Sequence, residues 1–167
     1  MRSAPLEMKR FAVAASLVVL GCATNPIPEG YTGPKATVRD SGASERASKA
    51  SFYYLSAVNG KTVNESLSET RQANHGRGFQ MTLNIVEREV PADRELQLTL
   101  DAKVAYAAPI LELINSGSMY HATQVIRFQP EPNGVYIVKG ELGADKSSVW
   151  LEDAKTKERV GTPVPKK

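Results

Sequence analysis

The sequence predicts an all-β fold, a single antiparallel β-sandwich or small barrel over residues 36–162. Three observations predict it. Side chains from Leu96 to Tyr106 alternate between apolar and polar, as in a strand with one buried face. Asn59-Gly60 follows a β-prone run, and this dipeptide suits the positive φ angles of a two-residue hairpin turn. About eight β-prone segments recur every 8–15 residues or so, with turn residues between them.

The first part of this domain should form a strand and then a hairpin. We expect strands over 36–40, 52–58 and 61–63. Residues 41–49 are small and polar, which indicates a loop or one helical turn. Residues 64–77 are polar without a clear period, which predicts a long surface loop with a helical turn at 65–70.

Residues 79–85 alternate in the same way as 96–106, so both segments are predicted strands. The turn residues 91–93 lie between them, and we expect the two strands to pair as the central hairpin of the sheet. Two sets of side chains would then face one core: Met81, Leu83 and Ile85, and Leu96, Leu98 and Leu100.

The remaining elements follow from turn and helix signals. Pro109 stands where a first helical turn favours proline, so residues 109–115 should form one or two helical turns that end before Ser116-Gly117. The segment PEPNG at 130–134 is a predicted turn. Strands are expected at 123–128, 135–142, 147–152 and 159–161.

The chain opens with a pattern typical of export signals. Residues 8–22 read MKRFAVAASLVVLGC, in which Lys9 and Arg10 precede an uncharged run that ends at the only cysteine, Cys22. A basic start, a short apolar stretch and a small residue before the cut are the layout of a secretory signal. A spanning helix would need about 20 apolar residues, roughly twice this run. A buried core helix is the other alternative, but the flanking basic and Pro/Gly-rich residues favour the signal.

The end of that run, Val19-Leu20-Gly21-Cys22, resembles the lipobox of bacterial lipoproteins. The resemblance implies cleavage between Gly21 and Cys22 and acylation of Cys22, which becomes the first mature residue. In lipoproteins similar to this one, a small neutral residue such as Ala23 after the cysteine implies sorting to the outer membrane, with the domain facing the periplasm. An odd cysteine in an exported protein needs an explanation, and acylation provides one.

The sequence therefore divides into a signal peptide at 1–21, a lipid-anchored tether at 22–35, the β-domain at 36–162 and a basic tail at 163–167. Residues 23–35 contain three prolines and two glycines without apolar periodicity. Such segments favour extended geometry at about 3.1 Å per residue, which gives the tether a reach of at most ~40 Å.

The charge distribution excludes a nucleic-acid footprint. The formal net charge is +3, but residues 36–162 carry 15 basic and 16 acidic side chains. Nucleic-acid binding needs clustered basic charge, and the predicted domain has no such excess.

The second half of the domain carries a further resemblance. An apolar strand, a Pro/Gly turn, a Tyr-x-Val-x-Gly strand and a Val-Trp-Leu-Glu-Asp strand follow one another between residues 125 and 160. This order is similar to that of small uncharacterised β-sandwich lipoproteins. The residues that carry the resemblance are Tyr136, Val138, Gly140, Val149, Trp150, Leu151, Glu152 and Asp153. It implies a β-sandwich and no established activity.

One loop is a candidate ligand site. In His75-Gly76-Arg77-Gly78 the glycines would expose backbone N–H groups, and the guanidinium of Arg77 can hold a phosphate through two hydrogen bonds. Phosphate-loop fingerprints need a strand before and a helix after, and neither is predicted here. The competing interpretation is a plain loop that leads into a strand.

Other chemistry-bearing residues have simpler structural interpretations. His75 and His121 lack the close spacing of zinc ligands, so no metal or other cofactor is expected. Glu152 and Asp153 are neighbours that should point to opposite faces of a strand, unlike a catalytic carboxylate pair. Ser116-Gly117-Ser118 is the end of a helical turn, and no strained nucleophile turn of the G-x-S-x-G type is present.

These observations favour a non-catalytic, lipid-anchored protein of the cell envelope. Its β-domain would serve as a structural or protein-interaction module with an envelope protein as partner, and Cys22 would hold it to the membrane. The alternative is a lipoprotein that binds a small ligand or cell-wall fragment through residues 64–78, and a hydrolase with dispersed catalytic residues is a third hypothesis. Fold alone does not choose among them.

Overall fold

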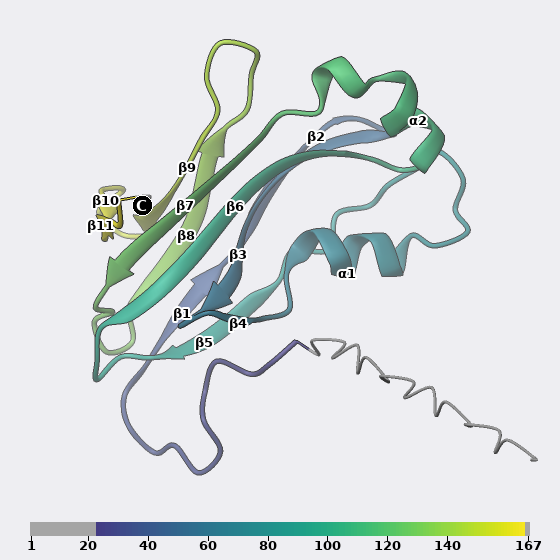
Figure 1. The fold of residues 1–167 in the computed structure, drawn as a ribbon. Helices are drawn as coiled ribbons and strands as arrows, with labels where there is room; N and C mark the ends of the chain where they lie inside the picture. The colour runs from purple at the N-terminus through teal and green to yellow at the C-terminus, as the bar shows by residue number, and fades with distance from the viewer. Residues whose placement is uncertain (1–22, 166–167) are drawn as a thin grey trace, which may run out of the picture.

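The computed structural model describes residues 23–165, which form two β-sheets packed face to face (Figure 1). The first sheet has the strand order β10-β9-β8-β1-β5, and the second has the order β11-β7-β6-β3-β2, with β4 also paired to β3. The predominantly β fold agrees with the prediction of a sandwich. One detail differs, because β1 and β8 pair in parallel while every other described strand pair is antiparallel.

The strands of the first sheet are β1 (Lys35–Arg39), β5 (Glu87–Pro91), β8 (Val135–Glu141), β9 (Ser148–Asp153) and β10 (Arg159–Val160). Those of the second are β2 (Ser41–Arg46), β3 (Lys49–Val58), β4 (Lys61–Thr62), β6 (Leu96–Tyr106), β7 (His121–Phe128) and β11 (Thr162–Pro163). Two α-helices, α1 (Ser66–Ala73) and α2 (Pro109–Ile114), and a 3-10 turn at Ser116–Ser118 complete the described structure.

The main core lies between the sheets. Inward side chains of β6, including the fully buried Leu98 and Leu100, meet those of β1, β8 and β9. The rings of Phe128 and Tyr136 pack edge to face with centroids 4.7 Å apart, a favoured aromatic geometry. The alternation of residues 96–106 therefore predicted both the strand and its buried face correctly.

Most of the other predicted elements are confirmed. Asn59 and Gly60 have φ angles of 51° and 76° between β3 and β4, as the hairpin turn requires. Asn133 adopts a φ of 61° in the turn before β8. Helix α2 begins at Pro109, whose missing N–H costs nothing in a first turn.

The predicted central hairpin is wrong. Residues 79–85 form no strand, and β6 pairs with β3 and β7 instead. Two side chains replace a strand partner. Asn74, the residue that caps the end of α1, bonds both backbone groups of Thr82, and the hydroxyl of Thr70, within α1, accepts from the backbone N–H of Asn84 at 2.8 Å. The segment thus satisfies its backbone without a β-ladder.

The apolar residues of this segment also miss the main core. Met81 and Leu83 pack on a second cluster, outside the sandwich, and Ile85 is 38% exposed. The buried members of that cluster are Ala50, Phe52, Leu67 and Ala105. The alternation of residues 79–85 correctly indicated that one face of the segment is buried. It did not indicate whether that face packs on the main core or on the second cluster.

Two further segments differ from the prediction. Residues 41–46, expected to be a loop or helical turn, form the edge strand β2, which pairs with β3 alone. The polar segment 64–77 contains a full helix, α1, where only a turn was expected. Glu65 caps it, since its carboxylate accepts from the backbone N–H groups of Leu67 and Ser68 at 2.6 and 2.9 Å.

Residues 23–34 contain no helix or strand. They loop below β1 and β5 in Figure 1, and backbone hydrogen bonds join them to the domain. The backbone N–H of Thr24 donates to the carbonyl of Thr62 at 2.8 Å, and that of Ala92 donates to the carbonyl of Pro34 at 2.8 Å. At the other end of the chain, Val164 continues the pairing of β11 by donating to Val125.

Candidate functional site

Gly21 and Cys22, the predicted cleavage and lipidation residues, lie outside the described residues. Their roles therefore stay predictions. Within residues 23–165, no helix has the length and apolar character needed to cross a bilayer.

A cleft is formed by α1, the loop after it and the start of α2. It has a volume of about 600 Å³, within the range of small-molecule sites. Its lining is Thr70, Arg71, Asn74, His75, Gly76, Gly78, Met81, Tyr106, Ala107, Ala108, Pro109 and Glu112. His75 is among these residues, and Arg77 is not. The structure thus brings one of the two predicted loop residues to the cleft.

The loop that carries His75 is fixed at both ends. Asn74 closes α1 by donating to the Thr70 carbonyl at 2.7 Å, and its bonds to Thr82 hold the far end. Gly76 and Gly78, between these ends, have φ angles of 81° and 67°, which glycine adopts without strain. The candidate anion loop is a tight return loop beside a helix end, and the strand expected after it does not form. Its role in anion binding stays a prediction.

An ion pair bridges the cleft. Nη2 of Arg71, on α1, lies 2.7 Å from Oε1 of Glu112, on α2. Sequence reasoning did not single out this pair, because its partners are 41 residues apart. The Arg71 guanidinium already has a carboxylate partner, so an anionic ligand would compete with Glu112 for it.

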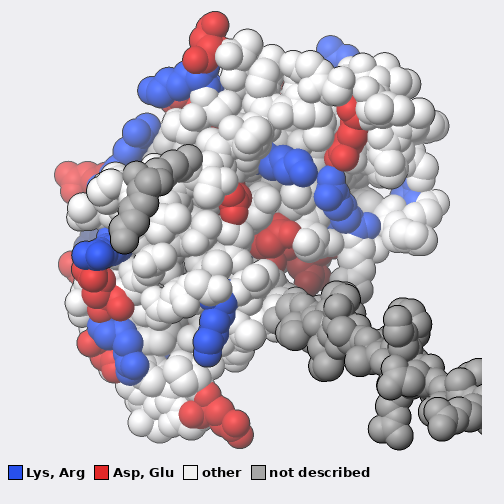
Figure 2. Space-filling view, in the orientation of Figure 1, with Lys and Arg blue, Asp and Glu red and all other residues white. Residues whose placement is uncertain are grey.

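Helix α2, at the rim of the cleft, exposes an apolar surface. None of its residues is buried, and Ile110, Leu113 and Ile114 are 52%, 72% and 72% exposed. We call these three residues the α2 patch. Figure 2 shows the corresponding end of the molecule as a largely uncharged surface. Exposed apolar patches of this kind commonly mark contact sites.

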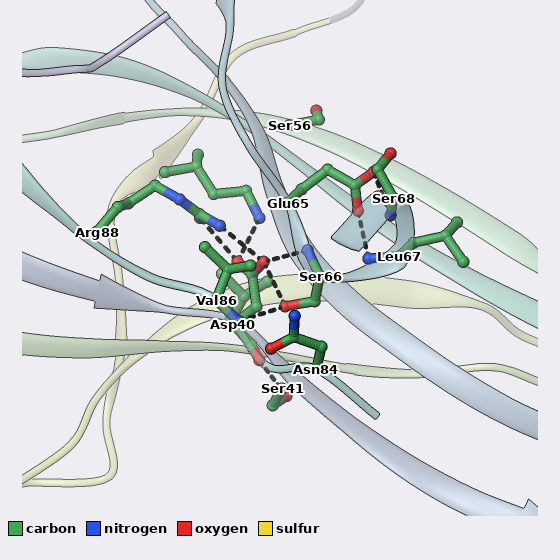
Figure 3. A network of polar contacts seen from close by, with 12 residues as sticks. Asp40, Ser41, Ser56, Glu65, Ser66, Leu67, Ser68, Asn84, Val86 and Arg88 are labelled. Atoms are coloured by element: carbon green, nitrogen blue, oxygen red, sulfur yellow. Dashed lines mark hydrogen bonds and ion pairs between the residues drawn. The ribbon is translucent and has the colours of Figure 1, made fainter. Parts of the chain in front are cut away.

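The most highly organised polar cluster surrounds Asp40, at the point where the chain crosses from β1 to β2 (Figure 3). Arg88 binds both oxygens of its carboxylate at 2.8 Å. The backbone N–H groups of Leu55 and Ser66 and the Ser66 hydroxyl also donate to it, at 2.8–3.0 Å. Asp40 is fully buried, and the Arg88 side chain is 7% exposed.

This cluster connects four parts of the fold. Asp40 joins the two sheets, Leu55 belongs to β3, Ser66 opens α1 and Arg88 lies in β5. The Ser66 hydroxyl also accepts from the backbone N–H of Val86 at 2.8 Å. A buried charge with this many donors is stable, so we assign the cluster a structural role. No sequence motif marks it.

The remaining candidates lie apart from the cleft. His121 begins β7 opposite Lys103. Asp153 accepts from the backbone N–H groups of Lys155 and Thr156 at 2.7 and 2.8 Å, and these bonds lower the pKa of its carboxyl. These bonds form a turn directly after β9.

The serines at 116 and 118 lie in the short 3-10 turn after α2, as expected for the end of a helical segment. Trp150 is only half-buried, and the Arg159 guanidinium stacks 3.7 Å above its ring. Among residues 23–165, no group of three or more His, Cys, Asp or Glu side chains is arranged to hold a metal ion.

Comparisons with known protein families, curated proteins and solved structures found no match to this chain.

Proposed function

We propose that this protein is a lipid-anchored lipoprotein of the bacterial cell envelope, held in the outer membrane through acylated Cys22. Its β-domain faces the periplasm and is a non-catalytic module that binds an envelope protein. The signal-like residues 8–22 support the anchoring. The α2 patch supports the binding role.

The exposed aliphatic side chains of α2 are the observation that carries this proposal. Complete burial of a Leu or Ile side chain contributes about 1.5–3 kcal/mol, and Ile110, Leu113 and Ile114 leave most of that unrealised. A partner with an apolar contact surface would recover it. The adjoining cleft would admit a side chain of the partner, because its wall includes Met81 and Pro109.

Site-specific crosslinking tests the proposal. A photo-crosslinking amino acid at Leu113 of the anchored protein should capture one dominant envelope protein. Adding Ile114→Asp should reduce the yield at least tenfold, because a carboxylate would be desolvated at the contact. Val135→Asp is the matched control, since Val135 is another exposed aliphatic residue at 41%. Equal yields in both variants, or no adduct at all, would contradict the proposal.

The volume of the cleft favours a second candidate function, the binding of a small ligand or cell-wall fragment. Here the imidazole of His75, which lines the cleft, would provide a polar contact. A ligand should then protect the loop from 74 to 82 in hydrogen exchange, and His75→Ala should weaken the protection. A partner protein should protect α2 most strongly.

A further inference from the structure

The segment 23–34 is fastened to the domain at both ends. At its start, the backbone N–H and the hydroxyl of Thr24 both donate to the carbonyl of Thr62 in β4, at 2.8 and 2.9 Å. At its end, the carbonyl of Pro34 accepts from the Tyr31 hydroxyl and from the backbone N–H of Ala92, both at 2.8 Å. We call residues 23–34 the strap.

The strap shortens the distance between the domain and its proposed lipid. A free proline-rich segment of this length would reach ~40 Å. Only Ala23 separates Cys22 from Thr24, and consecutive Cα atoms are about 3.8 Å apart, so the two Cα atoms are at most about 7.6 Å apart. An acyl group on Cys22 would therefore be attached two residues before the contact between Thr24 and β4.

We propose that the end of the sandwich carrying β4 lies against phospholipid headgroups and that the α2 patch is turned away from the bilayer. This inference rests on the proposed acylation of Cys22. Lys61, exposed in β4 next to Thr62, would place its ammonium among lipid phosphates. In this arrangement the acyl chains hold the protein to the bilayer, and the strap fixes which end of the domain faces it.

The register of the second sheet shows how far the β4 end of the sandwich lies from the α2 patch. Ala57 pairs with both Thr62 of β4 and Thr99 of β6. Tyr106, whose backbone N–H points to Glu112 of α2, lies seven residues further along β6. At about 3.3 Å per residue these points are ~23 Å apart. Figure 1 likewise shows β4 and α2 at opposite ends of the domain. The α2 patch is thus placed for a periplasmic partner and the β4 end for the membrane.

Depth measurement on the acylated full-length protein tests this orientation. Acylation would leave the chain no free thiol, because Cys22 is its only cysteine. Single cysteines at Lys61 and at Asp145, in the exposed β8–β9 loop, can each carry a fluorophore. In vesicles with nitroxide-labelled headgroups, Lys61→Cys should be quenched at least threefold more than Asp145→Cys.

A matched pair of variants tests the strap itself. Thr24→Pro removes the N–H and the hydroxyl, and it should abolish at least half of the quenching difference between the two sites. Thr24→Ser keeps both donors and should preserve it. Equal quenching at both sites of an acylated protein, or no effect of Thr24→Pro, would overturn the inference. Mass spectrometry of the same sample shows whether Cys22 is acylated. If Cys22 is not acylated, the proposed function is overturned as well, and if it is acylated, equal quenching overturns only the orientation.

Discussion

Removing the carboxylate of Asp40 should destabilise the domain more than any single surface change. In Asp40→Ala, the Arg88 guanidinium would stay buried without its partner, which typically costs about 3–5 kcal/mol. The backbone N–H groups of Leu55 and Ser66 would also lose their acceptor, at about 1–3 kcal/mol for each group that water does not reach. Because domains are stable by only about 5–15 kcal/mol, this variant should be close to unfolding.

Urea and thermal unfolding followed by circular dichroism measure this effect. We expect a loss of at least 3 kcal/mol or so, and a decrease in Tm of about 10 °C or more. Arg39→Ala is the control, because Arg39 makes a similar bond to Glu87 between β1 and β5, but with both side chains about half exposed. It should cost less than about 1 kcal/mol.

A double variant shows whether the two charges act together. Arg88→Ala in the Asp40→Ala background removes the unpaired charge, so the double variant should be less destabilised than the sum of the two single variants. Two results would refute the assignment of the cluster as the structural link between the sheets. One is a double variant whose loss in free energy of unfolding equals the sum of the two single losses. The other is an Asp40→Ala variant whose free energy of unfolding lies within about 1 kcal/mol of the wild type.

Three further outcomes follow from the core, a close backbone contact and one titrating group. Leu98→Asp should unfold the domain because Leu98 is fully buried, whereas Gln97→Asp, on the exposed face of the same strand, should leave the circular dichroism spectrum and Tm nearly unchanged. Gly140→Ala should lower the Tm, since a β-carbon there would lie 2.5 Å from a backbone oxygen of β9 and from a ring of β3. The hydrogen bond from Arg94 lowers the pKa of Asp93 to about 2. An NMR titration of Arg94→Ala should therefore show a higher pKa, and the stabilising contribution of this pair in the wild type should be lost only as the pH falls below about 4 towards 2.

Local sequence signals predicted the elements that depend on local chemistry. The alternation of residues 96–106 indicates a half-buried strand because successive side chains point to opposite faces. Asn59-Gly60 and Pro109 act through their own backbone preferences. Such signals operate within a few residues, so the sequence is sufficient to read them.

The errors arose where distant residues decide the structure. Residues 79–85 have a strand-like pattern, but Asn74 and Thr70 occupy the backbone groups that a ladder would use. Side chains that hydrogen-bond the backbone N–H and C=O groups of a segment compete with a β-ladder for them. The pattern of apolar and polar residues does not reveal this competition.

The site was only partly predictable for the same reason. His75 was identified from its loop, but the cleft beside it needs Pro109 and Glu112 from a distant segment. The exposure of Leu113 could not be read from its apolar character, which indicates burial as a rule. Asp40 resembles any strand-end aspartate in sequence, and only the fold brings Arg88 to it.

Complementation of a deletion strain tests the central claim most directly. The comparison uses the wild-type chain and a form exported by an ordinary signal peptide with Cys22→Ser. Removal of the acyl chains should abolish stable membrane attachment, and the substitution changes none of the residues 23–165 that form the domain. We predict that the unlipidated form folds and still forms the crosslink from Leu113 to its partner in vitro, but fails to complement. Full complementation by this soluble form would contradict the account and would favour a protein that captures a diffusible ligand.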